Sequence, residues 1–152
     1  MDVKTLLFPK DALVDVRAPD KARLLQDLAG HAAAALNLDR GLVAGELQKR
    51  EELGSTGIGK GVALPHARIE GLDKPFGVLA RLRKPIDFDA IDGEPVDIVF
   101  LLLLPATSGG EPLNALACVS RKLREDGTLR GLRRAEDGAA FYRVAVAQTA
   151  KP

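Results

Sequence analysis

The segment that most restricts the fold is an apolar run from Val96 to Leu104, which Asp97 interrupts and Pro105 follows. The run spans about nine residues, whereas a transmembrane helix needs about 20. A short segment that is apolar on both of its alternating faces is typical of a strand inside a sheet, covered on both sides. The sequence therefore predicts a buried central strand with elements packed on both faces, and no membrane insertion.

Helical and strand patterns alternate along the rest of the chain, which indicates an α/β fold. Asp20 and Asp39 are placed to cap helices over 20–36 and 40–53, and Gly54 is placed to end the second. Further strands are expected over 13–16, 62–64, 76–83 and 86–89, and further helices over 112–124, 129–132 and 136–147. We expect Lys84-Pro85 to end the strand over 76–83. No repeat or linker divides the chain, so we expect one domain over residues 1–152.

Composition restricts the ligands and partners that the chain can bind. The chain has 22 Lys and Arg against 21 Asp and Glu, and this net charge of +1 argues against nucleic-acid binding driven by bulk charge. Aromatic residues make up 4%, too few for a base-stacking platform. One cysteine, Cys118, and two histidines, His31 and His66, exclude an internal disulfide and a His- or Cys-rich metal cluster. We therefore expect no metal, no cofactor and no nucleic-acid partner.

Three features have plain structural interpretations. His31 lies among alanines within an expected helix, and we interpret it as a partly buried structural residue. Cys118 is most simply a small core residue. A basic cluster is interleaved with acidic residues, so it is expected to be a solvated face, the alternative being a docking surface for an acidic partner. Its members are Arg121, Lys122, Arg124, Arg130, Arg133 and Arg134.

The glycine-rich stretch 54–61 fits the pattern of a nucleotide-binding P-loop only in part. Gly61 stands where a Ser or Thr would bind magnesium. A P-loop also follows a strand and opens a helix, whereas this stretch follows a helix and precedes a strand. Two other interpretations stay open: a turn that uses glycine's conformational freedom, or backbone amides that approach an anion held by a nearby side chain.

His66 is the candidate for that side chain. It follows Val62-Ala63-Leu64-Pro65, so we expect it just past a buried strand, where the sheet edge meets solvent. An imidazole with a pKa of about 6.5 is largely unprotonated near neutral pH and can accept an acyl or phosphoryl group. Arg50 could bind phosphoryl oxygens with a bidentate fork, and Ser55 and Thr56 could supply hydroxyl donors. From composition alone, a lone histidine is more often structural.

Three stretches carry a family resemblance. They are Glu51 followed after six residues by Ile58 to Ala67, then Arg50-Glu51 with Gly54 to Gly59, and later Phe88 to Asp97. The first resembles the phosphohistidine signature of the fructose/mannitol-type (type-2) enzyme IIA domains of the sugar phosphotransferase system. The others look most like the nitrogen-regulatory enzyme IIA branch. The resemblance covers roughly residues 5 to 147.

The resemblance implies a three-layer α/β domain around a mixed, mainly five-stranded sheet. It implies that His66 takes phosphate on Nε2 from an HPr-like carrier protein, with Arg50 and Thr56 matching family positions near the histidine. It also implies a freestanding phosphoprotein of nitrogen regulation and signal transduction, with potassium transport or sensor-kinase targets. The N-terminus has no apolar stretch of signal-peptide length, so the expected compartment is the cytoplasm.

One position departs from the family. A second histidine is usual near the start of the helix after the Leu-Leu-Leu-Leu-Pro strand, and Pro112 takes that place here. Asn114 is a nearby donor, but two residues along a helix point it about 200° away. Phosphorylation is then slower, or the phosphohistidine is less stabilised, or Arg50 suffices. The alternatives are an interaction module with impaired phosphotransfer and a sugar-permease IIA subunit.

Overall fold

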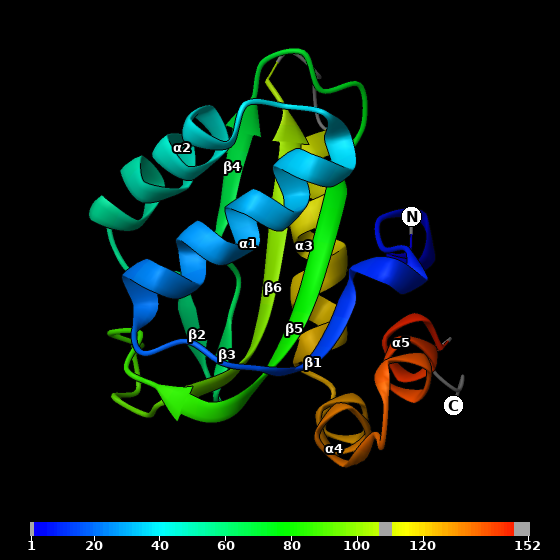
Figure 1. The fold of residues 1–152 in the computed structure, drawn as a ribbon. Helices are drawn as coiled ribbons and strands as arrows, with labels where there is room; N and C mark the ends of the chain where they lie inside the picture. The colour runs from blue at the N-terminus through cyan, green and yellow to red at the C-terminus, as the bar shows by residue number, and fades with distance from the viewer. Residues whose placement is uncertain (1, 107–110, 148–152) are drawn as a thin grey trace.

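A mixed β-sheet lies between two layers of helices (Figure 1). The structure, a computed structural model, describes residues 2–106 and 111–147. Within these residues the strands are β1 (Ala12–Val16), β2 (Gly57–Gly59), β3 (Val62–Ala63), β4 (His66–Ile69), β5 (Phe76–Ile86) and β6 (Val96–Pro105). Two short 3-10 helices, η1 (Val3–Thr5) and η2 (Pro9–Asp11), precede β1.

The order of strands across the sheet is β1-β5-β6-β3-β2, and β4 also pairs with β6. β5 runs antiparallel to β6, while β3 and β4 run parallel to it. Val62 of β3 faces Ile98, and His66 of β4 faces Leu102, so β3 and β4 follow one another along one side of β6. Counted as one interrupted strand, they make the sheet five strands across. This arrangement confirms the expected mixed, mainly five-stranded sheet.

The helices cover the two faces separately. α1 (Lys21–Leu36) and α2 (Arg40–Glu52) lie on one face, and α3 (Glu111–Leu123) lies on the other (Figure 1). α4 (Asp126–Arg134) and α5 (Gly138–Val146) complete the second layer. Among the described residues, no helix is both long enough and apolar enough to cross a membrane.

The first two helices begin where the sequence predicts. The side chain of Asp20 accepts a hydrogen bond from the backbone N–H of Arg23 at 2.9 Å. Asp39 accepts one in the same way from Leu42 at 2.9 Å. Each bond satisfies one of the N–H groups that the first turn of a helix leaves without a partner. Between the two helices, Asn37 ends α1 in the left-handed conformation, with φ of 56°.

β6 is the buried central strand that the apolar run predicts. Val99, Leu101 and Leu103 pack into the core beneath α1 and α2. The alternate residues, Ile98, Phe100 and Leu102, pack into the second core with α3, α4 and α5. Because both faces are buried, neither set can be polar, which explains the nearly continuous apolar sequence.

The expectation that Lys84-Pro85 ends its strand is wrong, because β5 continues to Ile86. The pairing with β6 shifts register between Arg81, opposite Ile98, and Ile86, opposite Val96. Proline cannot donate a ladder hydrogen bond, and such an irregular stretch tolerates the missing donor. The sequence also did not predict β2 and β4, which have three and four residues and are too short for a clear alternating pattern.

Candidate functional site

His66 lies at the break between β3 and β4. It follows the buried strand β3, as the sequence predicts, and it is also the first residue of β4, so it is held within the sheet. Backbone hydrogen bonds fix the segment before it on two sides. Leu64 N donates to Thr56 O at 2.9 Å, and Leu102 N donates to Pro65 O at 2.9 Å. The histidine is therefore carried by a rigid connection.

The imidazole has one ring nitrogen occupied and one left for chemistry. Nδ1 of His66 lies 2.9 Å from Leu64 O. A carbonyl oxygen can only accept, so Nδ1 carries the hydrogen and donates it. In the neutral ring the lone pair is then on Nε2. The geometry therefore leaves the lone pair on Nε2, the atom that the family resemblance implies as the phosphate acceptor.

The surroundings of His66 favour its neutral form. Burial has the largest effect and lowers the pKa below its ordinary value of 6.5. The hydrogen bond to Leu64 and the carboxylate of Glu51 raise the pKa, and the positive charge of Arg50 lowers it. Because the net direction is downward, the ring is unprotonated near neutral pH and its Nε2 lone pair is free to react.

We expect His66 to titrate below 6.5, as measured by NMR from the pH dependence of its ring signals. The unfolded chain then takes up this proton at a higher pH than the folded chain. As pH falls from above 6.5 towards the folded pKa, the unfolded state binds more protons and the free energy of unfolding decreases. A His66→Ala variant assigns the signal and should lack this part of the pH dependence. A midpoint at or above 6.5 would contradict the expectation.

Arg50 is brought to the same place from the C-terminal end of α2. One of its nitrogens, Nη1, donates to Gly54 O at 2.9 Å, which ties the side chain across the start of the glycine-rich stretch. The guanidinium has five N–H donors, so this bond leaves others for an anion. Since its charge acts on the pKa of His66, the structure joins these two predicted residues in one site.

The hydroxyls of Ser55 and Thr56 have other partners in this structure. Ser55 Oγ donates to Phe88 O and accepts from Gly57 N at 3.0 Å. Thr56 is buried, and its hydroxyl donates to Oε1 of Glu51. Each hydroxyl has a single hydrogen, which is used in these bonds. That these hydroxyls donate hydrogen bonds to a bound phosphate stays a prediction. Such bonds would require the two hydrogens to leave their present partners.

Lys21 and Glu51 are the residues near the site that sequence reasoning gave no role. Lys21 Nζ lies 2.8 Å from Oε2 of Glu51, whose side chain is 6% exposed. Glu51 stands beside Arg50 in the stretch that resembles the family, so the sequence indicated the position of Glu51 but not its function. Lys21 comes from the first turn of α1, and no local pattern connects that helix to the end of α2.

The glycine-rich stretch forms a hairpin between β2 and β3. Gly59, Lys60 and Gly61 all have positive φ, of 97°, 59° and 78°. The two glycines adopt this conformation without steric cost, and Lys60 is a non-glycine residue in the left-handed region. Lys60 Nζ pairs with Asp126 at 3.3 Å, and its backbone N–H donates to Asp92 at 3.0 Å. The stretch opens no helix, so the structure supports the turn interpretation over a P-loop.

Pro112, the residue in place of the family's second histidine, is within the first turn of α3. Its side chain lies outside the described residues. Asn114, in the same helix, is exposed. Among the described residues, no group of three or more His, Cys, Asp or Glu could hold a metal ion.

His31 is partly buried, as predicted. Its Nε2 lies 2.8 Å from Oδ1 of the fully buried Asp11, so it links α1 to η2. Arg133, one member of the basic cluster, is bonded to other parts of the protein rather than only to solvent. It pairs with Asp97 at 2.9 Å and donates to Lys60 O at 2.6 Å.

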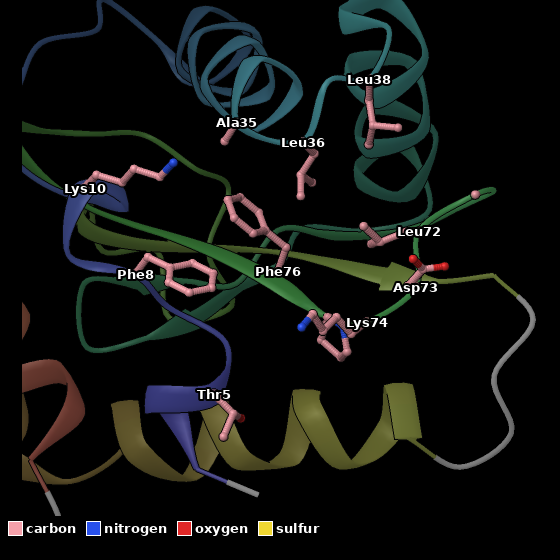
Figure 2. A pocket seen from close by; sticks show the side chains of 12 residues that line it. Thr5, Phe8, Lys10, Ala35, Leu36, Leu38, Leu72, Asp73, Lys74 and Phe76 are labelled. Atoms are coloured by element: carbon pink, nitrogen blue, oxygen red, sulfur yellow. The ribbon is translucent and has the colours of Figure 1, made fainter.

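A separate hollow of about 350 Å³ lies among η2, the end of α1 and the start of β5 (Figure 2). The rings of Phe8 and Phe76 lie beside one another in it, with centroids 6.4 Å apart. Lys10 and Lys74 are also among its lining residues. It shares no lining residue with the site built around His66 and Arg50.

Comparisons with known proteins agree with the family resemblance of the sequence. The family model described as "Phosphoenolpyruvate-dependent sugar phosphotransferase system, EIIA 2" matches residues 5–146. A nitrogen regulatory protein of Bradyrhizobium diazoefficiens is 42% identical over 144 residues, which cover 95% of this chain and 94% of the relative. A PTS system fructose-specific EIIA component of Haloferax volcanii is 38% identical over 112 residues, 74% of this chain and 71% of the relative.

The fold is likewise similar to a solved structure. The crystal structure of nitrogen regulatory protein IIA-Ntr from Neisseria meningitidis matches with a TM-score of 0.86 and 31% sequence identity. The match covers 94% of this chain and 98% of that one. Both the sequence and the fold likenesses therefore extend over nearly the whole chain.

Proposed function

Because the chain belongs to the EIIA type-2 family of the phosphoenolpyruvate-dependent phosphotransferase system, we propose that His66 accepts phosphate on Nε2 from an HPr-like carrier protein. The observation that carries this proposal is the Nδ1–H bond to Leu64 O at 2.9 Å, which leaves the Nε2 lone pair available. The lowered pKa of His66 keeps that lone pair unprotonated at neutral pH. The protein acts as a phosphocarrier within one domain.

The transfer forms one bond and breaks one. Nε2 attacks phosphorus while the bond to the carrier's donor atom breaks, and the electron pair of that bond stays with the carrier. The ring becomes more positive as the new bond forms, and the Leu64 carbonyl stabilises this charge through Nδ1–H. Arg50 binds the phosphoryl oxygens, because phosphoryl transfer depends chiefly on positioning and cationic stabilisation.

The proposed role of the phosphate is regulatory. A phosphoryl group adds a charge of about −1.5 to −2 at neutral pH and three strong acceptors. The chain carries +1, so one phosphate reverses its net charge. We propose that cytoplasmic targets in nitrogen regulation, such as a potassium transport protein or a sensor kinase, bind according to this state. The sequence likeness to a nitrogen regulatory protein supports this assignment.

A reconstituted relay tests the proposal. Phosphoenolpyruvate, enzyme I and the carrier are mixed with the purified chain, and phosphate incorporation is read by intact mass before and after acid treatment. We expect one acid-labile phosphate per chain, since phosphohistidine is the product. Absence of labelling, or an acid-stable phosphate, would overturn the proposal.

The Pro112 substitution gives a second prediction. We expect Arg50 to suffice, so Pro112→His should change the transfer rate by less than about tenfold. A missing transition-state donor typically costs about 100-fold or more. A gain of that size in Pro112→His would favour the alternative, an interaction module with impaired phosphotransfer. Stopped-flow or quench-flow transfer from the phosphorylated carrier measures the rate.

A sugar-permease IIA subunit is the other candidate, favoured by the likeness to a fructose-specific EIIA component. This function requires the phosphate to move onward from His66 to a IIB module. Incubating the phosphorylated chain with a purified fructose-type IIB domain separates the two. Rapid onward transfer would support the permease role, and a stable phosphorylated chain supports the regulatory one.

A further inference from the structure

We propose that Glu51, held between Lys21 and Thr56, is a positioning residue that fixes the segment carrying His66 and thereby aims Nε2 at the incoming phosphoryl group. The reaction that it would serve rests on the proposed function, but the positioning itself is a property of the unphosphorylated protein. It can therefore be tested even if phosphate transfer fails.

The carboxylate of Glu51 is almost completely removed from solvent and is held by three contacts. Its side chain is 6% exposed, and Oε2 lies 2.8 Å from Lys21 Nζ. Thr56 contributes both other donors, its backbone N–H to Oε2 at 3.2 Å and its hydroxyl to Oε1. A buried carboxylate loses hydration and needs such donors, so all three contacts favour one fixed position of the side chain.

Lys21 is itself fixed by the loop after β5. Its Nζ lies 3.4 Å from Phe88 O and 4.7 Å from the centroid of the fully buried Phe88 ring. Ser55 Oγ donates to the same carbonyl. The ammonium group is thus anchored to the core rather than free at the surface, and its pairing with Glu51 joins α1 to α2.

Two further hydrogen bonds connect Thr56 to the imidazole. Leu64 N donates to Thr56 O at 2.9 Å, and Leu64 O accepts from His66 Nδ1 at 2.9 Å. Leu64 is therefore the link between Glu51's partner and the ring. A displacement of Thr56 would move Leu64 and rotate the imidazole, so that Nε2 of His66 would point in another direction. A misplacement of a reacting atom by about 1 Å can lower the rate about 100-fold.

The charges of this group also suit a site that receives an anion. Glu51 raises the pKa of His66, against the larger lowering by burial. An unpaired carboxylate in this place would repel phosphoryl oxygens, and Lys21 offsets that charge at 2.8 Å. Glu51 therefore supplies the hydrogen-bond acceptors that hold Thr56, and Lys21 neutralises its charge, so no bare negative charge is left beside His66.

Glu51→Gln removes the charge and nearly preserves the shape. We expect the His66 pKa to fall further, because a group that raises it has been neutralised. We also expect the maximal transfer rate to fall by about 10- to 100-fold, with little change in the carrier concentration at half-maximal rate. The matched control is Glu52→Gln, since Glu52 is exposed and contacts Gln48 at 3.4 Å. This control should titrate and react as the unmodified chain does.

A second pair of variants separates positioning from folding. Thr56→Val removes the hydroxyl while keeping the volume, and Thr56→Ser keeps the hydroxyl. We expect Thr56→Val to lower the maximal rate and to change the NMR signal of the His66 Nδ1 hydrogen, and Thr56→Ser to recover most of both. If Glu51→Gln does not fold, this pair carries the test.

The outcomes distinguish the two proposals. If the unmodified chain takes no phosphate, the proposed function fails, while the pKa and Nδ1–H signals of the variants still test the positioning. If Glu51→Gln folds but matches Glu52→Gln in pKa and rate, the positioning proposal is wrong. It is equally wrong if Thr56→Val and Thr56→Ser behave alike, or if Glu51→Gln affects only the affinity for the carrier.

Discussion

His66→Ala should remove all acid-labile phosphate from the chain, rather than reduce it by a factor. The proposed nucleophile is Nε2 of His66, and a guanidinium such as that of Arg50 can bind phosphoryl oxygens but cannot accept the group. The chain has one other histidine, His31, whose Nε2 lies 2.8 Å from the buried carboxylate of Asp11. That nitrogen is occupied and is not available to a carrier protein.

Intact mass after the complete relay measures this loss, and circular dichroism checks that the variant is folded. The matched control is His31→Gln, which removes the other imidazole and keeps a hydrogen-bonding group towards Asp11. We expect the control to take up phosphate like the unmodified chain. Phosphate that survives in His66→Ala would place the acceptor elsewhere and would remove the basis of the relay.

Phe100→Ala should lower the free energy of unfolding by about 3–5 kcal/mol, a large share of the about 5–15 kcal/mol typical of a domain. Phe100 lies in the centre of β6 and is 1% exposed. Its ring packs directly over Gly77 of β5, where an added Cβ would come within 2.4 Å of Phe100 Cε1. Since glycine has no side chain to fill the space, the cavity left by alanine should persist.

Urea unfolding followed by circular dichroism measures this effect. Phe8→Ala is the matched control, because Phe8 is 49% exposed and loses less burial when it is shortened. We expect a shift of the midpoint in Phe100→Ala with little change in the slope, which would mean that the denatured state is unchanged. A loss as small as that of Phe8→Ala would show that the second core tolerates the cavity.

The sequence alone determined the features that depend on near neighbours in the chain. Asp20 and Asp39 cap helices because a cap bonds an N–H three residues ahead. The run from Val96 to Leu104 predicts a central strand because burial on both faces leaves a continuous local pattern. His66 and Arg50 were likewise predicted from one stretch of sequence, whose resemblance to the type-2 enzyme IIA signature implies the phosphohistidine chemistry.

Tertiary structure decided which groups those residues meet. Whether the Thr56 hydroxyl faces a phosphate or Glu51, and whether Lys21 reaches the end of α2, depends on contacts between distant segments. His66 lies within the sheet because β4 pairs with β6. A four-residue strand has too short an alternating pattern for the sequence to predict that pairing. Periodicity reports which face of an element is buried, whereas the partner across that face is set only when the layers pack together.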